Sequence, residues 1–95
     1  MSIEDQICKI IRDAMAQTGQ ESAPHYVYAV LIGIHNLPPS DRQNISVIRS
    51  CCNGFYAGFD GIPELILRIE NEDSPESEIF YCVVDKIRKE FKVGR

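Results

Sequence analysis

Residues 22–40 read SAPHYVYAVLIGIHNLPPS, and this stretch decides the fold. Pro24 stands near its start, where a first-turn residue has no intrahelical hydrogen bond to lose. Leu37 precedes Pro38 and is therefore pushed out of the helical region, which ends the element. The length of the segment and its Ser-Ala-Pro start predict a helix over residues 24–36.

The same segment leaves a second interpretation open. Residues 26–34 are rich in β-branched and aromatic side chains and offer no polar face. A central helix covered by other helices has this composition, and so does a buried strand. We therefore expect an all-α fold, and the alternative is an α+β fold in which residues 26–34 form a strand.

Further helices are predicted around that segment. Ser2, Ser40 and Ser74 stand just before helical patterns, as N-cap residues do, and residues 40–43 fit the capping box S-x-x-Q. Pro63 stands at a first helical position. The expected helices span residues 3–18, 24–36, 40–56, 63–70 and 75–92. They predict a single domain, residues 1–95, built as a bundle of about five helices.

Apolar side chains recur at three- and four-residue spacing in these segments, which predicts one buried stripe on each helix. The stripes of the first and last helices comprise Ile3, Ile7, Ile10, Ile11, Ala14 and Met15, and Ile79, Phe80, Val83, Val84, Ile87 and Phe91. We expect Ile11, Leu31 and Val84 to be buried and Lys89 to be exposed.

The charge balance limits the classes of partner. The net charge is −4 at pH 7, with 14 acidic and 10 basic residues, and half of the bases lie between residues 86 and 95. Nucleic-acid binding depends on Lys and Arg neutralising phosphates, so an acidic body argues against it. The longest uncharged apolar run, residues 26–34, is far shorter than the about 20 residues of a membrane span, so no membrane span is expected.

The cysteines are Cys8, Cys51, Cys52 and Cys82. Residues 1–13 carry charges at helical spacing and lack the apolar core of a secretory signal. Cys51 and Cys52 would point apart on a helix, and all four cysteines lie in apolar stretches. We therefore expect free, buried thiols in a cytoplasmic protein rather than disulfides.

Residues that could catalyse a reaction or hold a metal are scattered. Zinc sites usually contain C-x₂₋₄-C pairs, and the chain has none. His25 and His35 stand at the two ends of one expected helix, where we expect them at solvent edges. Cys51 and Cys52 lie late in their helix, away from the N-terminal end that lowers a thiol pKa. We therefore expect no catalytic residue, no metal and no cofactor, and the chain does not read as an enzyme.

Two groups of residues are candidate protein-binding surfaces. The first is an acidic run that could face a basic partner or serve only as a solvated loop. The second is a tyrosine pair, because Tyr is enriched at interfaces, although both rings could instead lie at the core edge. The candidate residues are Glu70, Glu72, Asp73, Glu76 and Glu78 in the run, and Tyr26 and Tyr28 in the pair.

These observations indicate a small acidic cytoplasmic protein that acts by binding another protein, in an inhibitor, immunity-type or adaptor role. A chain this short also often gains stability by forming a homodimer or docking on a partner. The alternative is a helix-turn-helix DNA-binding regulator built from residues 44–69, with two short helices about a glycine turn. The third interpretation, supported least, is an enzyme that uses Cys or His.

Overall fold

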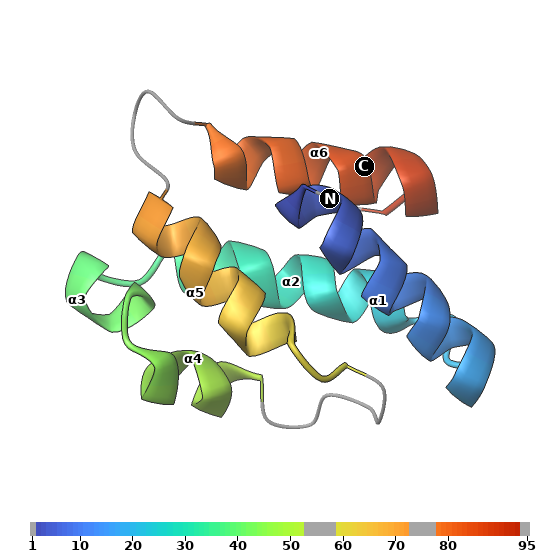
Figure 1. The fold of residues 1–95 in the computed structure, drawn as a ribbon, viewed down its shortest axis with the longest axis horizontal. Helices are drawn as coiled ribbons and strands as arrows, with labels where there is room; N and C mark the ends of the chain where they lie inside the picture. Colours follow the sequence, from blue (N-terminus) through green and yellow to red (C-terminus); the bar gives the residue numbers. More distant parts are fainter. Residues whose placement is uncertain (1, 53–58, 73–77, 94–95) are drawn as a thin grey trace.

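The computed structural model describes residues 2–52, 59–72 and 78–93, and in these ranges the chain is all-α with no strand (Figure 1). The helices are α1 (Ile3–Thr18), α2 (Ala23–His35), α3 (Pro39–Arg42), α4 (Ile45–Cys51), α5 (Ile62–Glu72) and α6 (Ile79–Phe91). The all-α prediction is confirmed. The alternative strand over residues 26–34 is wrong, because these residues form the middle of α2.

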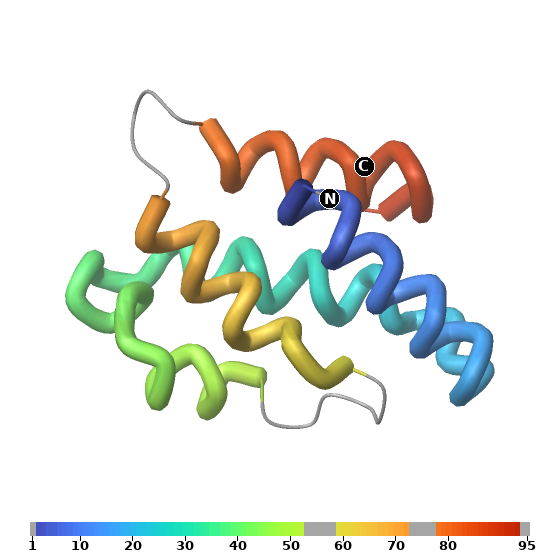
Figure 2. The backbone as a smooth tube through the Cα atoms, in the orientation of Figure 1, coloured from blue at the N-terminus to red at the C-terminus, as the bar shows by residue number. Residues whose placement is uncertain are grey.

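The helices pack in a bundle in which α1, α2 and α6 all contact one another. Figure 2 shows α1 running from beside α6 down to the start of α2, with α5 crossing in front of α2. Helix α5 packs against α1, α4 and α6, and α3 leads into α4. Helix α2 is therefore covered on its inner side, while its outer side remains open to solvent.

Helix α1 begins and ends where the sequence predicts. The Ser2 Oγ accepts a hydrogen bond of 3.2 Å from the Asp5 amide, which satisfies one of the unpaired N–H groups of the first turn. Gly19 adopts φ 70° and donates its amide to the Met15 carbonyl at 2.8 Å. That left-handed conformation suits glycine, which has no Cβ to clash.

The single helix expected over residues 40–56 is wrong, because two short helices, α3 and α4, occupy residues 39–42 and 45–51. Ser40 lies inside α3 and does not cap a long helix. The cap is Asn44, whose Oδ1 accepts hydrogen bonds from the amides of Ser46 and Val47 at 2.9 and 3.4 Å. An asparagine cap restarts the chain as a new helix in a new direction.

Helix α6 begins at Ile79, and the predicted helix start at Pro75 falls outside the described residues. Glu78 precedes it with φ 56°, an uncommon backbone conformation for a residue other than glycine. Ser74, Pro75 and Glu76 lie outside the described residues.

The core contains side chains from α1, α2, α4, α5 and α6. Ile11 and Leu31 are fully buried and Val84 is 7% exposed, while Lys89 is exposed, so the expected faces of these helices are confirmed. The largest fully buried side chains include Ile7, Ile11, Leu31, Ile34, Ile48, Ile62, Ile66, Ile69 and Ile87.

Candidate functional site

Glu70 is the one charged residue buried in the described part of the chain, at 2% exposure. Its two carboxylate oxygens lie 3.2 and 3.1 Å from Nδ1 of His35. An ionised carboxylate can only accept hydrogen bonds, so Nδ1 of His35 donates in this contact. The Arg42 Nε lies 3.5 Å from Glu70 Oε1, and the Arg42 Nη1 donates to the His35 carbonyl at 3.0 Å.

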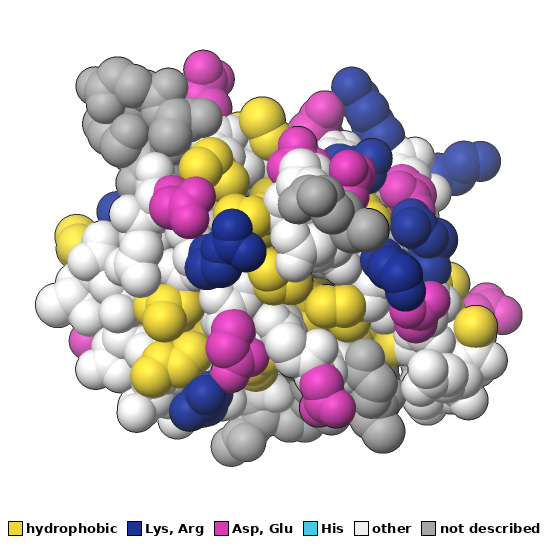
Figure 3. Space-filling model, in the orientation of Figure 1, with side chains coloured by type: hydrophobic (Ala, Val, Ile, Leu, Met, Phe, Trp, Pro, Cys, Tyr) yellow, Lys and Arg dark blue, Asp and Glu magenta, His cyan; other side chains and the backbone are white. Residues whose placement is uncertain are grey.

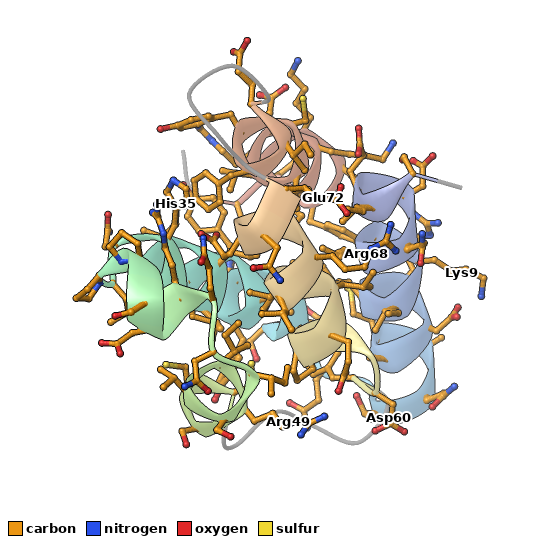
Figure 4. The ribbon with its side chains drawn as sticks, turned by 60° about the vertical axis from the view of Figure 1, so that its left-hand side comes forward. Lys9, His35, Arg49, Asp60, Arg68 and Glu72 are labelled. Carbon is orange, nitrogen blue, oxygen red and sulfur yellow. The ribbon has the colours of Figure 1, made fainter. Side chains whose placement is uncertain are left out.

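This group, the Glu70 cluster (His35, Arg42 and Glu70), joins four helices. His35 ends α2, Arg42 ends α3 and Glu70 belongs to α5. The His35 ring also stacks on Phe80 of α6, with centroids 3.6 Å apart and planes 7° apart. Figure 4 shows His35 on the side of the molecule where α2 and α3 meet. The cluster therefore fastens α3 to the bundle.

The placement of Glu70 corrects a sequence-based expectation. Glu70 was expected on an acidic surface, but its carboxylate is directed inward and paired with His35 and Arg42. The sequence does contain a signal that Glu70 is buried. Glu70 follows Ile66 by four residues, so the two side chains lie on the same buried stripe of α5. His35, expected at a solvent edge, has a side chain only 20% exposed.

Two further members of the acidic run, Glu72 and Glu78, lie in the described residues, and both are exposed. Glu72 is exposed and lies 3.8 Å from Arg68 one turn earlier on α5, and both are labelled in Figure 4. Glu78 is exposed at the start of α6. Asp73 and Glu76 lie outside the described residues.

The two candidate tyrosines flank α2 on opposite sides. Tyr26 and Tyr28 are both half-buried, and two residues two positions apart are about 200° apart around a helix. Ala29 and Gly33 lie exposed between these flanks, and no Asp, Glu, Lys or Arg occurs from residue 22 to residue 40. We call the surface formed by Tyr26, Tyr28, Ala29, Ile32 and Gly33 the α2 face.

Two ion pairs hold α6 against α1, and one of them uses a base of the C-terminal end. Lys86 lies 3.1 Å from Asp5, and Arg12 pairs with Glu90. The hydrogen bond from Lys86 holds the pKa of Asp5 below its usual value. Figure 3 shows charged side chains of both signs gathered over α1 and α6. Lys86 and Glu90 at this end therefore serve the fold.

The cysteines divide into two classes. Cys8 and Cys52 are buried, but Cys51 and Cys82 are exposed, so the expectation of four buried thiols is wrong for these two. Burial raises the pKa of Cys8 and Cys52 to about 11. A thiol with such a pKa is almost entirely protonated at neutral pH and reacts slowly.

We therefore expect alkylation of the native protein near neutral pH to modify Cys51 and Cys82 first. Cys8 and Cys52 should react only after unfolding, since both access and thiolate formation are suppressed. Peptide mass spectrometry of samples alkylated with and without denaturant measures this. Equal labelling of all four cysteines in the native protein would contradict the burial of Cys8 and Cys52.

No protein-family model matches the chain, and neither a curated protein nor a solved structure matches it. Within the described ranges, no group of three His, Cys, Asp or Glu side chains is arranged to hold a metal ion. A search of the same residues finds no helix with the length and apolar character needed to cross a membrane.

Proposed function

We propose that this protein acts by binding another protein through the α2 face. The observation that carries the proposal is an outward helix surface with no charged residue in its own sequence, where Ala29 and Gly33 are exposed between half-buried apolar flanks. Helices on the surface of a globular protein usually direct charged or polar side chains outward. Helix α2 has none of the four charged residue types along its whole length.

The composition of the α2 face is that of an interface centre. Interface cores are depleted in charged residues and enriched in tyrosine, and Tyr26 and Tyr28 belong to this face. Ala29 and Gly33 have little or no side chain, so the backbone of a partner could approach α2 closely there. The role that fits is that of a cytoplasmic inhibitor, immunity-type protein or adaptor, with the acidic body favouring a basic rim on the partner.

A pair of substitutions at Gly33 tests this proposal. A Cβ added at Gly33 meets no atom within 4 Å, so alanine fits there, and the position is exposed, so an arginine side chain can extend into solvent. We expect Gly33→Arg to abolish capture of the partner from a lysate of the native cell, because a charged side chain would lie at the interface centre. Gly33→Ala is the matched control and should retain the partner.

The comparison requires that the melting temperatures of both variants are at or above that of the original protein. A protein captured by the original chain and by Gly33→Ala, and lost from Gly33→Arg, supports the α2 face as the binding surface. Capture of the same proteins by all three chains would overturn the proposal.

Gly33→Ala should also increase stability. Glycine in a helix interior costs about 1 kcal/mol relative to alanine, because it loses more backbone freedom on folding. Gly33 is in the last turn of α2, so we expect a gain of about 0.5 kcal/mol in the free energy of unfolding. Urea denaturation measures the difference, and a loss of stability would show that the site is more confined than the structure indicates.

The helix-turn-helix alternative has less support. Helix α4 ends at Cys51 and α5 begins at Ile62, and residues 53–58 between them, which would supply the turn, lie outside the described residues. The arginines of this region are paired with acids, Arg49 with Glu64 at 2.8 Å and Arg68 with Glu72. A gel-shift experiment at low salt tests it directly, since measurable binding to duplex DNA would count against the protein-docking proposal.

A further inference from the structure

The outer face of α6 carries a regular stripe of exposed residues. Its members recur at alternating steps of three and four, the spacing of the a and d positions of a heptad, and Glu78 and Lys92 flank the helix at its two ends. This α6 stripe consists of Glu78, Tyr81, Asp85, Arg88 and Lys92, all of them exposed.

Tyr81 is the largest apolar contribution to the stripe. It is 62% exposed, the one large hydrophobic side chain that the described part of the chain presents so openly. Its ring meets Phe80 and His35 edge-on at 5.2 and 6.0 Å, which fixes its position. Shallow depressions lie along both halves of the stripe, beside Glu78 and Tyr81 and beside Arg88 and Lys92. Tyr81 can therefore act as an aromatic anchor without first being ordered.

The charges of the stripe are arranged by position. Acids occupy its first part, at Glu78 and Asp85, and bases its last part, at Arg88 and Lys92. No ion pair joins the side chain of Glu78 or Arg88 to another described residue, while Asp85 pairs with Lys89 on its own helix at 3.0 Å. By contrast, Lys86 and Glu90 on the neighbouring flank of α6 pair with Asp5 and Arg12 of α1.

We propose that the α6 stripe is a surface for a second copy of this chain, which binds in antiparallel orientation about a two-fold axis near residue 83. In an antiparallel pair the numbers of opposed residues have a constant sum. The register that opposes Glu78 to Arg88 of the partner subunit therefore also opposes Tyr81 to Asp85 of the partner subunit. Two-fold symmetry repeats both contacts.

Every stripe residue from 78 to 88 has a suitable neighbour in this register. Glu78 meets an arginine of opposite charge, and the Tyr81 hydroxyl can donate to a carboxylate that still has acceptor capacity beside Lys89. The contact area of two short helices is small, so the dimer is a weak and salt-sensitive one. This proposal is independent of the proposed function, because it uses α6 and not the α2 face.

Charge exchange tests the register. Glu78→Arg places two arginines opposite each other at both ends of the contact, and Arg88→Glu places two glutamates there. Each single variant should weaken self-association at least about tenfold. An equimolar mixture of the two variants restores opposite charges at both contacts, so it should form a heterodimer. The doubly exchanged chain, Glu78→Arg with Arg88→Glu, should dimerise like the original.

Sedimentation equilibrium in about 0.1 M and about 1 M salt measures these states, because the Debye length falls from about 10 Å to about 3 Å between them. The control is Lys9→Glu, the same reversal at an exposed position of α1, which should leave the dimer unchanged. A monomeric original chain at low salt would overturn the proposal. So would a dimer that tolerates both single reversals, or a mixture of the two variants that remains monomeric.

Discussion

Replacing Glu70 with alanine should lower the free energy of unfolding by about 3 kcal/mol. Removing one member of a buried ion pair leaves its partner charge uncompensated, at a cost of about 3–5 kcal/mol. Arg42 has a side chain 28% exposed and can turn partly toward water, which favours the lower end of that range. Urea denaturation followed by circular dichroism measures the loss.

Glu72→Ala is the matched control for this prediction. Glu72 lies two residues further along α5, but its side chain is 50% exposed and its pairing with Arg68 is a surface contact. Exposed ion pairs contribute about 0–1 kcal/mol, so this variant should lose less than about 0.5 kcal/mol. Equal losses for the two variants would show that the Glu70 cluster does not stabilise the fold.

The parts of the fold that the sequence predicts best are those in which local signals agree. In α1, the Ser2 cap, the apolar stripe and Gly19 all indicate one helix with the same ends, and the structure has that helix. In α6, the stripe around Val83 and Ile87 predicts the buried face correctly. Such signals act within a few residues of one another, so the sequence displays them directly.

Competing local signals account for the errors at helix ends. Both Ser40 and Asn44 are good N-cap residues, and the sequence offers no way to weigh the Ser40 capping box against the cap at Asn44. The structure uses Asn44, because the chain must turn between α3 and α4 to bring Ile48 into the core. That requirement comes from packing between helices, and local propensity does not contain it.

The Glu70 cluster could not be predicted because its partners are far apart in sequence. His35 and Glu70 are separated by 35 positions, and only the packing of α2 against the α5–α6 side of the bundle brings them to 3.1 Å. The apolar spacing of α5 does place Glu70 on a buried stripe, which indicates that a basic side chain must pair with its carboxylate. The sequence does not indicate which basic residue pairs with Glu70.

That Tyr26 and Tyr28 bind a partner stays a prediction, and the structure gives the positions of both side chains. Tyr26 and Tyr28 lie at the two sides of the α2 face, with Ala29 and Gly33 exposed between them. The uncharged outer side of α2 and its buried inner side explain why the segment reads as apolar all round. One side is apolar because it forms the core, and we propose that the other, on which His25 is exposed, carries no charged residue because it binds a partner.

Leu31→Ala should cost about 2–4 kcal/mol, because Leu31 is fully buried on the inner side of α2. The cost combines the lost transfer free energy of the side chain with that of the cavity it leaves. We expect losses in the same range for Ile11→Ala in α1, which is also fully buried, and for Val84→Ala in α6. A domain of this size has a total stability of about 5–10 kcal/mol, so each change removes a large part of it.

Lys89→Ala is the control for these core variants. Lys89 is exposed and pairs only with Asp85 on its own helix, so its removal should cost less than about 0.5 kcal/mol. Urea denaturation of the four variants gives the comparison. The buried positions should unfold at clearly lower urea concentrations than Lys89→Ala, since the denaturation midpoint falls in proportion to stability. Comparable midpoints for Leu31→Ala and Lys89→Ala would show that the inner side of α2 does not form the core.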